Sequence, residues 1–194
     1  VKDITARDIW IARSRIAPYV TKTPLVYSHT LSEMTGANIY LKLENLQEIG
    51  AFKVRGAANK ILSLPEGSRK AGVSTFSTGN HGAAVAYISS KLGIPAIVCM
   101  SRHVPEVKVK NIARWGAKIL QNWDSQDDAG VYCYEMEREQ GITVIPPFDD
   151  KEIICGQATM ALEIVEDLPK VDTVLVPLSG GGLISGVTLG MKMT

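Results

Sequence analysis

A lysine at the start of a predicted helix is the first residue whose setting could do chemistry. The stretch GAFKVRGAANK, residues 50–60, places Lys53 in the first helical turn, beside the aromatic ring of Phe52. A positive helix end and a nearby apolar ring both disfavour the charged ammonium and lower the pKa of such an amine. A neutral amine can form a Schiff base with an aldehyde. The alternative is a surface lysine whose stem packs on Phe52, and the lysine taken alone favours this alternative.

Three consecutive glycines form the strongest local signal. In VLVPLSGGGLISG, residues 174–186, an apolar run leads through Gly180, Gly181 and Gly182 into a helix. Glycines let backbone amides approach an anion, and a helix N-terminus adds a favourable dipole, so the pattern favours a phosphate site. The alternative is a tight strand-to-helix turn that needs small residues.

Two nucleotide motifs fail on this glycine segment by one residue each. The triphosphate motif G-x-x-x-x-G-K-[ST] has Val187 where its lysine must stand, and the dinucleotide motif G-x-G-x-x-G has Ser185 in place of its third glycine. A nucleotide-binding α/β protein without a Schiff base is therefore a weak alternative.

Small polar residues gather before another predicted helix. The stretch FSTGNHGAAVAY, residues 76–87, contains hydroxyl, amide and imidazole groups at a strand-to-helix turn. Free backbone amides at a helix start suit a carboxylate. An ordinary N-cap would explain one of these polar residues, not all of them. The residues concerned are Ser77, Thr78, Gly79, Asn80 and His81.

The elements that must position these residues alternate between strands and helices. Short apolar runs separated by helical stretches of this length predict βαβ crossovers and a parallel sheet. Strands are expected at 38–43, 72–76, 95–100, 117–120, 142–145 and 173–178, and helices at 4–20, 52–62, 82–92, 105–115, 127–140, 155–168 and after 182.

Composition excludes several classes of protein. Of the 194 residues, 45% are hydrophobic and 21% charged, and the net charge of +1 argues against nucleic-acid binding. The three cysteines form no C-x-x-C pair, so no disulfide framework or metal site is expected and a reducing cytoplasm fits. No apolar run approaches the ~20 residues of a membrane span.

The three motifs, in this order, resemble the fold-type II pyridoxal-phosphate (PLP) enzymes, in particular the threonine/serine dehydratase and serine racemase group. The resemblance covers nearly the whole chain. It is carried by AFKVRGA at 51–57, STGNH at 77–81 and SGGGL at 179–183, with YLKLENLQ, IPPFDD and CGQATMALEI between them. STGNHG, SQDD and PPFDD are most similar to the hydroxyectoine-utilisation dehydratase subgroup.

The resemblance implies a role for each motif. Lys53 would hold PLP, with Phe52 near the cofactor ring and Asn80 bonded to the ring hydroxyl. The phosphate would bind Gly180, Gly181, Gly182 and Leu183, and the substrate carboxylate would bind Ser77, Thr78, Gly79, Asn80 and His81. The implied reaction converts a small β-hydroxy amino acid to a 2-oxo acid and ammonia, with Lys53 as the base. Thr78 stands where racemases of this family carry a serine, which leaves racemase activity as an alternative.

The resemblance also implies an α/β architecture of two open parallel-type sheets with helices on both faces. A small domain, 68–146, is inserted into a larger one formed by 1–67 and 147–194, and a homodimer is expected. Ala51 departs from the usual Ser or Asn, and family chains continue for roughly another hundred residues, so we expect an incomplete chain. A PLP-fold protein that binds ligand without turnover remains an alternative.

Overall fold

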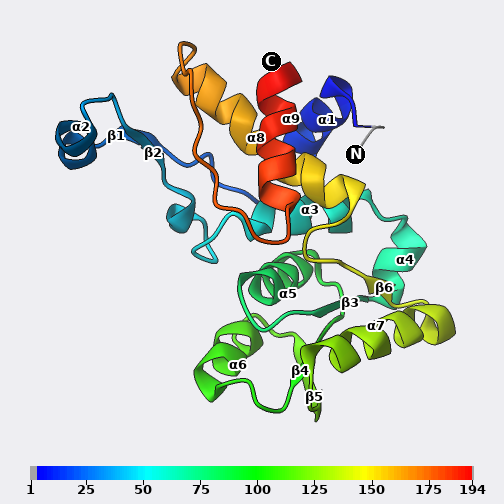
Figure 1. Cartoon of the computed structure of the whole chain (residues 1–194). Coiled ribbons are helices and arrows are strands. Elements are labelled where there is room, and N and C mark those ends of the chain that lie inside the picture. The colour runs from blue at the N-terminus through cyan, green and yellow to red at the C-terminus, as the bar shows by residue number, and fades with distance from the viewer. Residues whose placement is uncertain (1–3, 194) are drawn as a thin grey trace.

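The computed structural model describes residues 4–193: helices cover a four-stranded sheet, and a two-stranded sheet projects to one side (Figure 1). The elements are α1 (Ala6–Ile16), β1 (Leu25–Tyr27), α2 (His29–Thr35), β2 (Tyr40–Lys42), the 3-10 helix η1 (Glu44–Leu46), α3 (Lys53–Ser63), α4 (Glu66–Ala71), β3 (Val73–Phe76), α5 (Asn80–Leu92), β4 (Ala96–Ser101), α6 (Glu106–Ala113), β5 (Lys118–Trp123), α7 (Gln126–Gln140), β6 (Thr143–Val144), α8 (Lys151–Asp167) and α9 (Gly182–Met193).

The larger sheet is parallel and has the strand order β5-β4-β3-β6. From β3 the chain moves outward through β4 to β5, and it then returns across the sheet to place β6 on the other side of β3. Right-handed crossovers in opposite directions put their helices on opposite faces. The predicted α/β class with a parallel sheet is confirmed, and the order reverses between β3 and β6.

Helices cover both faces of this sheet (Figure 1). Along β4, Val98 and Met100 pack in the cluster formed with α5 and α6, whereas Cys99 packs against α7 on the other face. This alternation follows from the two-residue period of a strand, whose successive side chains point to opposite faces. The apolar β4 is therefore buried from both sides, as is typical of parallel sheets.

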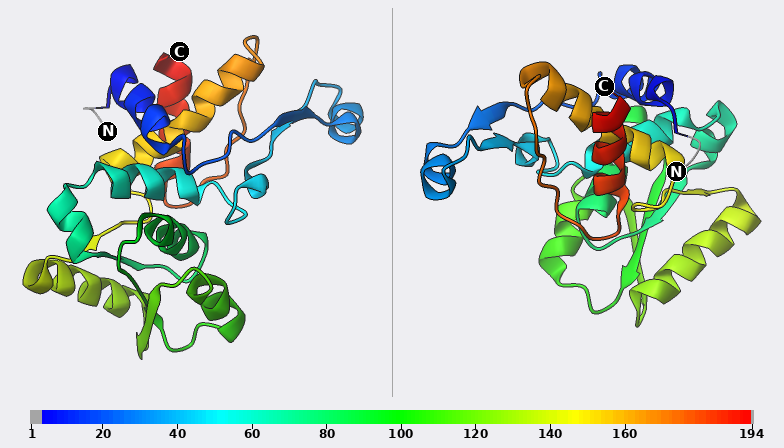
Figure 2. Two further views of the ribbon diagram at one scale, coloured as in Figure 1. Left: turned by 180° about the vertical axis from the view of Figure 1, so that it is seen from behind. Right: turned by 45° about the horizontal axis from the view of Figure 1, so that its top comes forward.

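The helix α3 joins this sheet region to a second group of helices, α1, α8 and α9 (Figure 2). On one side α3 packs against α5, and on the other its backbone lies directly against α8. A Cβ added to Gly156 of α8 would lie 2.7 Å from the Cα of Gly56 in α3. The contact therefore requires glycine, and it fixes the helix that carries Lys53.

One predicted strand does not form. Residues 173–178 adopt no strand, and Leu175 and Leu178 are 88% and 72% exposed. A strand requires hydrogen bonds to a neighbour, and within residues 4–193 no strand pairs with this segment.

The second sheet of the described residues is the antiparallel pair β1–β2, not a parallel sheet. No described helix is long and apolar enough to span a membrane.

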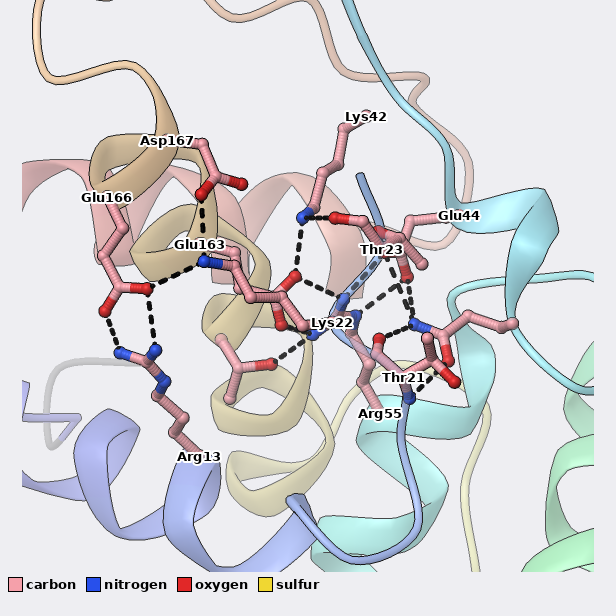
Figure 3. Close-up of polar contacts among 12 residues, drawn as sticks. Arg13, Thr21, Lys22, Thr23, Lys42, Glu44, Arg55, Glu163, Glu166 and Asp167 are labelled. Atoms are coloured by element: carbon pink, nitrogen blue, oxygen red, sulfur yellow. Dashed lines mark hydrogen bonds and ion pairs between the residues drawn. The ribbon is translucent and has the colours of Figure 1, made fainter. Parts of the chain in front are cut away.

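A buried ionic network holds α3 to α8 and to the segment after β2 (Figure 3). The Arg55 side chain is 1% exposed, and its guanidinium donates two hydrogen bonds to Glu44 and two to Glu163. Thr159 accepts a further bond at 3.1 Å, and Lys42 pairs with Glu163 at 2.6 Å. Arg55 lies two residues after Lys53, so this network anchors the first turns of α3.

We expect Arg55→Met to destabilise the fold strongly, because Glu44 would lose its cationic partner and Glu163 would keep only Lys42. Removing one member of a buried ion pair costs about 3–5 kcal/mol. The matched control is Arg13→Met, which removes a more exposed bidentate pair with Glu166 and should cost less than about 1 kcal/mol. Urea unfolding measures both, and equal losses would contradict the assigned importance of Arg55.

Candidate functional site

The strand order reverses between β3 and β6, whose carboxyl ends lie side by side. In open parallel sheets, ligands bind where the strand order reverses, outside the carboxyl ends of the strands. Here the segment 77–81 follows β3 and the segment 145–148 follows β6. Both segments therefore lie where ligands bind in sheets of this kind.

Lys53, at the start of α3, reaches the segment that follows β6. Its Nζ donates a hydrogen bond to the carbonyl oxygen of Pro147 at 2.6 Å and lies 5.5 Å from the centroid of the Phe52 ring. Burial lowers the pKa of the Lys53 amine below its usual value. The direction agrees with the expectation from the sequence, and it makes the neutral, nucleophilic form more accessible.

The glycine segment lies against the residue that follows Pro147. A Cβ on Gly180 would stand 2.3 Å from the Phe148 ring, and one on Gly182 would stand 3.0 Å from the Phe148 carbonyl oxygen. Gly181 has a φ of +87°, which side-chain-bearing residues rarely adopt. Leu183 follows in the first turn of α9, where backbone amides have no acceptor within the helix. Close packing and backbone conformation together require this run of glycines.

The segment after β3 leaves the start of α5 without a side-chain cap. The N-cap is Gly79, and no side chain bonds to the first-turn amides. Ser77 instead accepts a hydrogen bond from the Gly79 amide at 3.4 Å, and Asn80 is exposed while Thr78 is half-buried. The hydroxyls therefore do not serve as an ordinary cap, which leaves the amides at this helix end available to an anion.

The side chain of His81 contacts the segment that follows β6. Its side chain is buried, and its Nε2 lies 3.0 Å from the carbonyl oxygen of Ile145. Burial, together with the positive charge of Lys53, lowers the pKa of His81 to about 4. The imidazole is therefore neutral at pH 7. Its place in a carboxylate subsite stays a prediction, and the side chain already has another partner.

The structure thus brings Lys53 and the glycine segment together around residues 147 and 148. Sequence reasoning named both motifs but gave no role to Pro147 or Phe148, which it noted only within the run IPPFDD. A signal was present: two consecutive prolines provide no backbone donor, so a free carbonyl beside them is a natural acceptor. What the sequence could not show was that Lys53, 94 residues away from Pro147, supplies the donor.

We expect the buried, neutral His81 to make stability fall in acid. Its folded pKa, about 4, lies below the ordinary value of 6.5, so the unfolded chain binds the proton first as pH falls. Stability is unaffected above pH 6.5 and is lost progressively toward pH 4. Between pH 7.5 and 5 the loss from this group is about 2 kcal/mol.

Urea unfolding at both pH values measures this loss, and His81→Gln should reduce it. The matched control is His103→Gln, because the His103 side chain is 71% exposed. If the loss of stability stayed unchanged in His81→Gln and became smaller in His103→Gln, His103 and not His81 would be its source.

Known proteins are similar to this chain over nearly its whole length. A putative threonine dehydratase of Sinorhizobium fredii is 47% identical over 192 residues, which are 99% of this chain and 58% of the relative. The L-threonine ammonia-lyase of Thermotoga maritima is 44% identical, over 97% of this chain and 47% of its own length. The chain therefore spans about half the length of these relatives.

Solved structures show the same fold. The structure of maize serine racemase matches 97% of this chain and 57% of its own, with a TM-score of 0.93 and 41% sequence identity. The family described as pyridoxal-phosphate dependent enzyme matches residues 16–194. The motifs, the fold and these matches agree: the chain belongs to the family of pyridoxal-phosphate dependent enzymes.

Proposed function

We propose that these residues form part of a PLP-dependent ammonia-lyase that converts a small β-hydroxy amino acid, of the threonine or serine type, to a 2-oxo acid and ammonia. The observation that carries the proposal is the juxtaposition of a partly desolvated lysine amine with a glycine-lined helix start, both in contact with the segment 147–148. The threonine dehydratase and threonine ammonia-lyase among its relatives support the substrate class.

The residues present fit PLP. Lys53 supplies the amine for the aldehyde, and Phe52, half-buried beside it, supplies an apolar surface. Gly180, Gly181 and Gly182, with Leu183, supply backbone amides for the phosphate at the start of α9. When bound, PLP acts as an electron sink that stabilises negative charge at the substrate α-carbon.

The protein residues then bind the substrate and move its protons. The uncapped amides of 79–81 hold the substrate carboxylate, with the side chains of Ser77, Thr78 and Asn80 beside them. His81 contributes through its backbone. The amine of Lys53 takes the α-proton, and its lowered pKa makes the neutral base accessible near pH 7. Asn80 would bind the ring hydroxyl of the cofactor.

Racemisation of the same substrate class is the second candidate. Thr78 carries a hydroxyl on the half-buried segment after β3, and the maize serine racemase shares this fold. Returning a proton to the opposite face of the α-carbon would require such a group. Measurement of the stereochemistry of recovered substrate separates the two activities.

The remaining proposals concern the whole protein. We place a small domain at 68–146, which contains all four strands of the parallel sheet, within a larger one of 1–67 and 147–194. The three cysteines are free and buried, which fits a reducing cytoplasm. A homodimer acting on a free amino acid, without a nucleic acid or membrane partner, completes the proposal.

Lys53→Ala tests the cofactor assignment. We expect the full-length protein with PLP to show a visible Schiff-base absorption band that borohydride reduction traps on Lys53, and we expect Lys53→Ala to lose both the band and 2-oxo acid production. Lys60→Arg is the matched control, because Lys60 lies on the same helix and pairs with Asp150. A band that survives in Lys53→Ala would refute the assignment, and a trapped adduct without product would favour ligand binding without turnover.

Gly182→Ala tests the phosphate site. The added Cβ would stand 3.0 Å from the Phe148 carbonyl oxygen and disturb the first turn of α9. We expect the Kd for PLP to rise roughly tenfold and that for pyridoxal, which lacks the phosphate, to change less. Fluorescence titration measures both. Gly67→Ala, in an open position on α4, is the control, and equal effects on the two ligands would place the phosphate elsewhere.

A further inference from the structure

His81 is a buried titratable side chain to which the proposed reaction gives no task. It is 3% exposed, and its Nδ1 has no hydrogen-bond partner among the described residues. Its Nε2 faces a carbonyl oxygen, which can only accept, so Nε2 carries the ring proton. The side chain therefore serves as a neutral donor to one acceptor, the carbonyl of Ile145.

Both the carbonyl and the amide of Ile145 make hydrogen bonds. The Ile145 oxygen accepts from His81 Nε2 at 3.0 Å and from the Thr75 hydroxyl at 2.8 Å. The Ile145 amide donates to the Ser74 carbonyl at 2.8 Å, where β6 meets β3. Three hydrogen bonds therefore hold the two peptide groups that flank the Ile145 Cα, at the end of β6.

The chain from Ile145 to the Lys53 acceptor is short and stiff. Pro146 and Pro147 follow directly, and each ring restricts φ and removes the backbone donor. The carbonyl oxygen of Pro147 accepts a hydrogen bond from Lys53 Nζ at 2.6 Å. The orientation of Ile145 is thereby transmitted to the atom that binds the lysine amine.

We propose that His81 is a positioning residue for Lys53, acting through the Ile145 carbonyl and the two prolines to hold the Pro147 carbonyl on the lysine amine. The inference deepens the proposed function and rests on it, because it concerns the same Schiff-base lysine. A hydrogen bond to a carbonyl favours the ammonium form of Lys53. Loss of the positioning should therefore lower the pH at which this amine becomes neutral.

The test compares His81→Leu with His81→Gln in the full-length protein after removal of PLP. Leucine fills the space without a donor, whereas the glutamine amide can still donate to Ile145. Reductive methylation of Lys53 with formaldehyde and cyanoborohydride, measured across pH by peptide mass spectrometry, reports the neutral amine. We expect the midpoint for Lys53 to fall by about one pH unit in His81→Leu and to stay near the wild-type value in His81→Gln.

Two further variants keep the test decisive. Ser89→Ala removes another buried polar group of α5 and should leave the midpoint unchanged. Thr75→Val removes the second donor to Ile145 and should shift the midpoint in the same direction, which serves if His81→Leu does not fold. An unchanged midpoint in folded His81→Leu or Thr75→Val overturns the inference. Absence of a PLP adduct on wild-type Lys53 would instead overturn the proposed function.

Discussion

The buried guanidinium of Arg55 is the constraint on which the arrangement of the site depends. It joins three separate segments, and its two carboxylate partners come from opposite sides in the sequence, at Glu44 and Glu163. The pKa of Glu44 stays lowered despite burial, because Arg55 and Thr23 bond its charged form. An apolar residue could fill the same space, but it would not fix the rotation of α3 through directed bonds, and that rotation determines where Lys53 points.

Around this anchor, the site is assembled from backbone more than from side chains. The acceptor for Lys53 is a carbonyl, the proposed phosphate site consists of amides, and the start of α5 is left free of any side-chain cap. Glycine and proline dominate these segments because each controls what the backbone can approach or donate. Such groups need no side-chain ordering when a ligand arrives, so the site is preorganised.

The sequence predicted the long, strongly periodic elements and the motifs well. A helix forms within 4–20, and β3, β4 and β5 lie where the apolar runs placed them. The strand predicted at 173–178 was wrong, because β-branched residues favour a strand but do not supply the neighbouring strand that it must pair with. The short α2 and α4 were missed, although Ser28 and Gly36 mark both ends of α2. The spacing of Glu44, Arg55 and Glu163 in the sequence does not predict an ion network. Arg55 and Glu163 are 108 residues apart, and only the folded chain brings them together.

The sequence separation between Lys53 and Pro147 also bears on how the protein is made. During synthesis the lysine leaves the ribosome well before its acceptor, which follows 94 residues later, so it begins as an ordinary hydrated ammonium. Only when β6 has paired beside β3 is Pro147 in place to accept from the amine, which then becomes partly buried. The nascent chain therefore carries no activated nucleophile, and the reactive amine appears together with the completed fold.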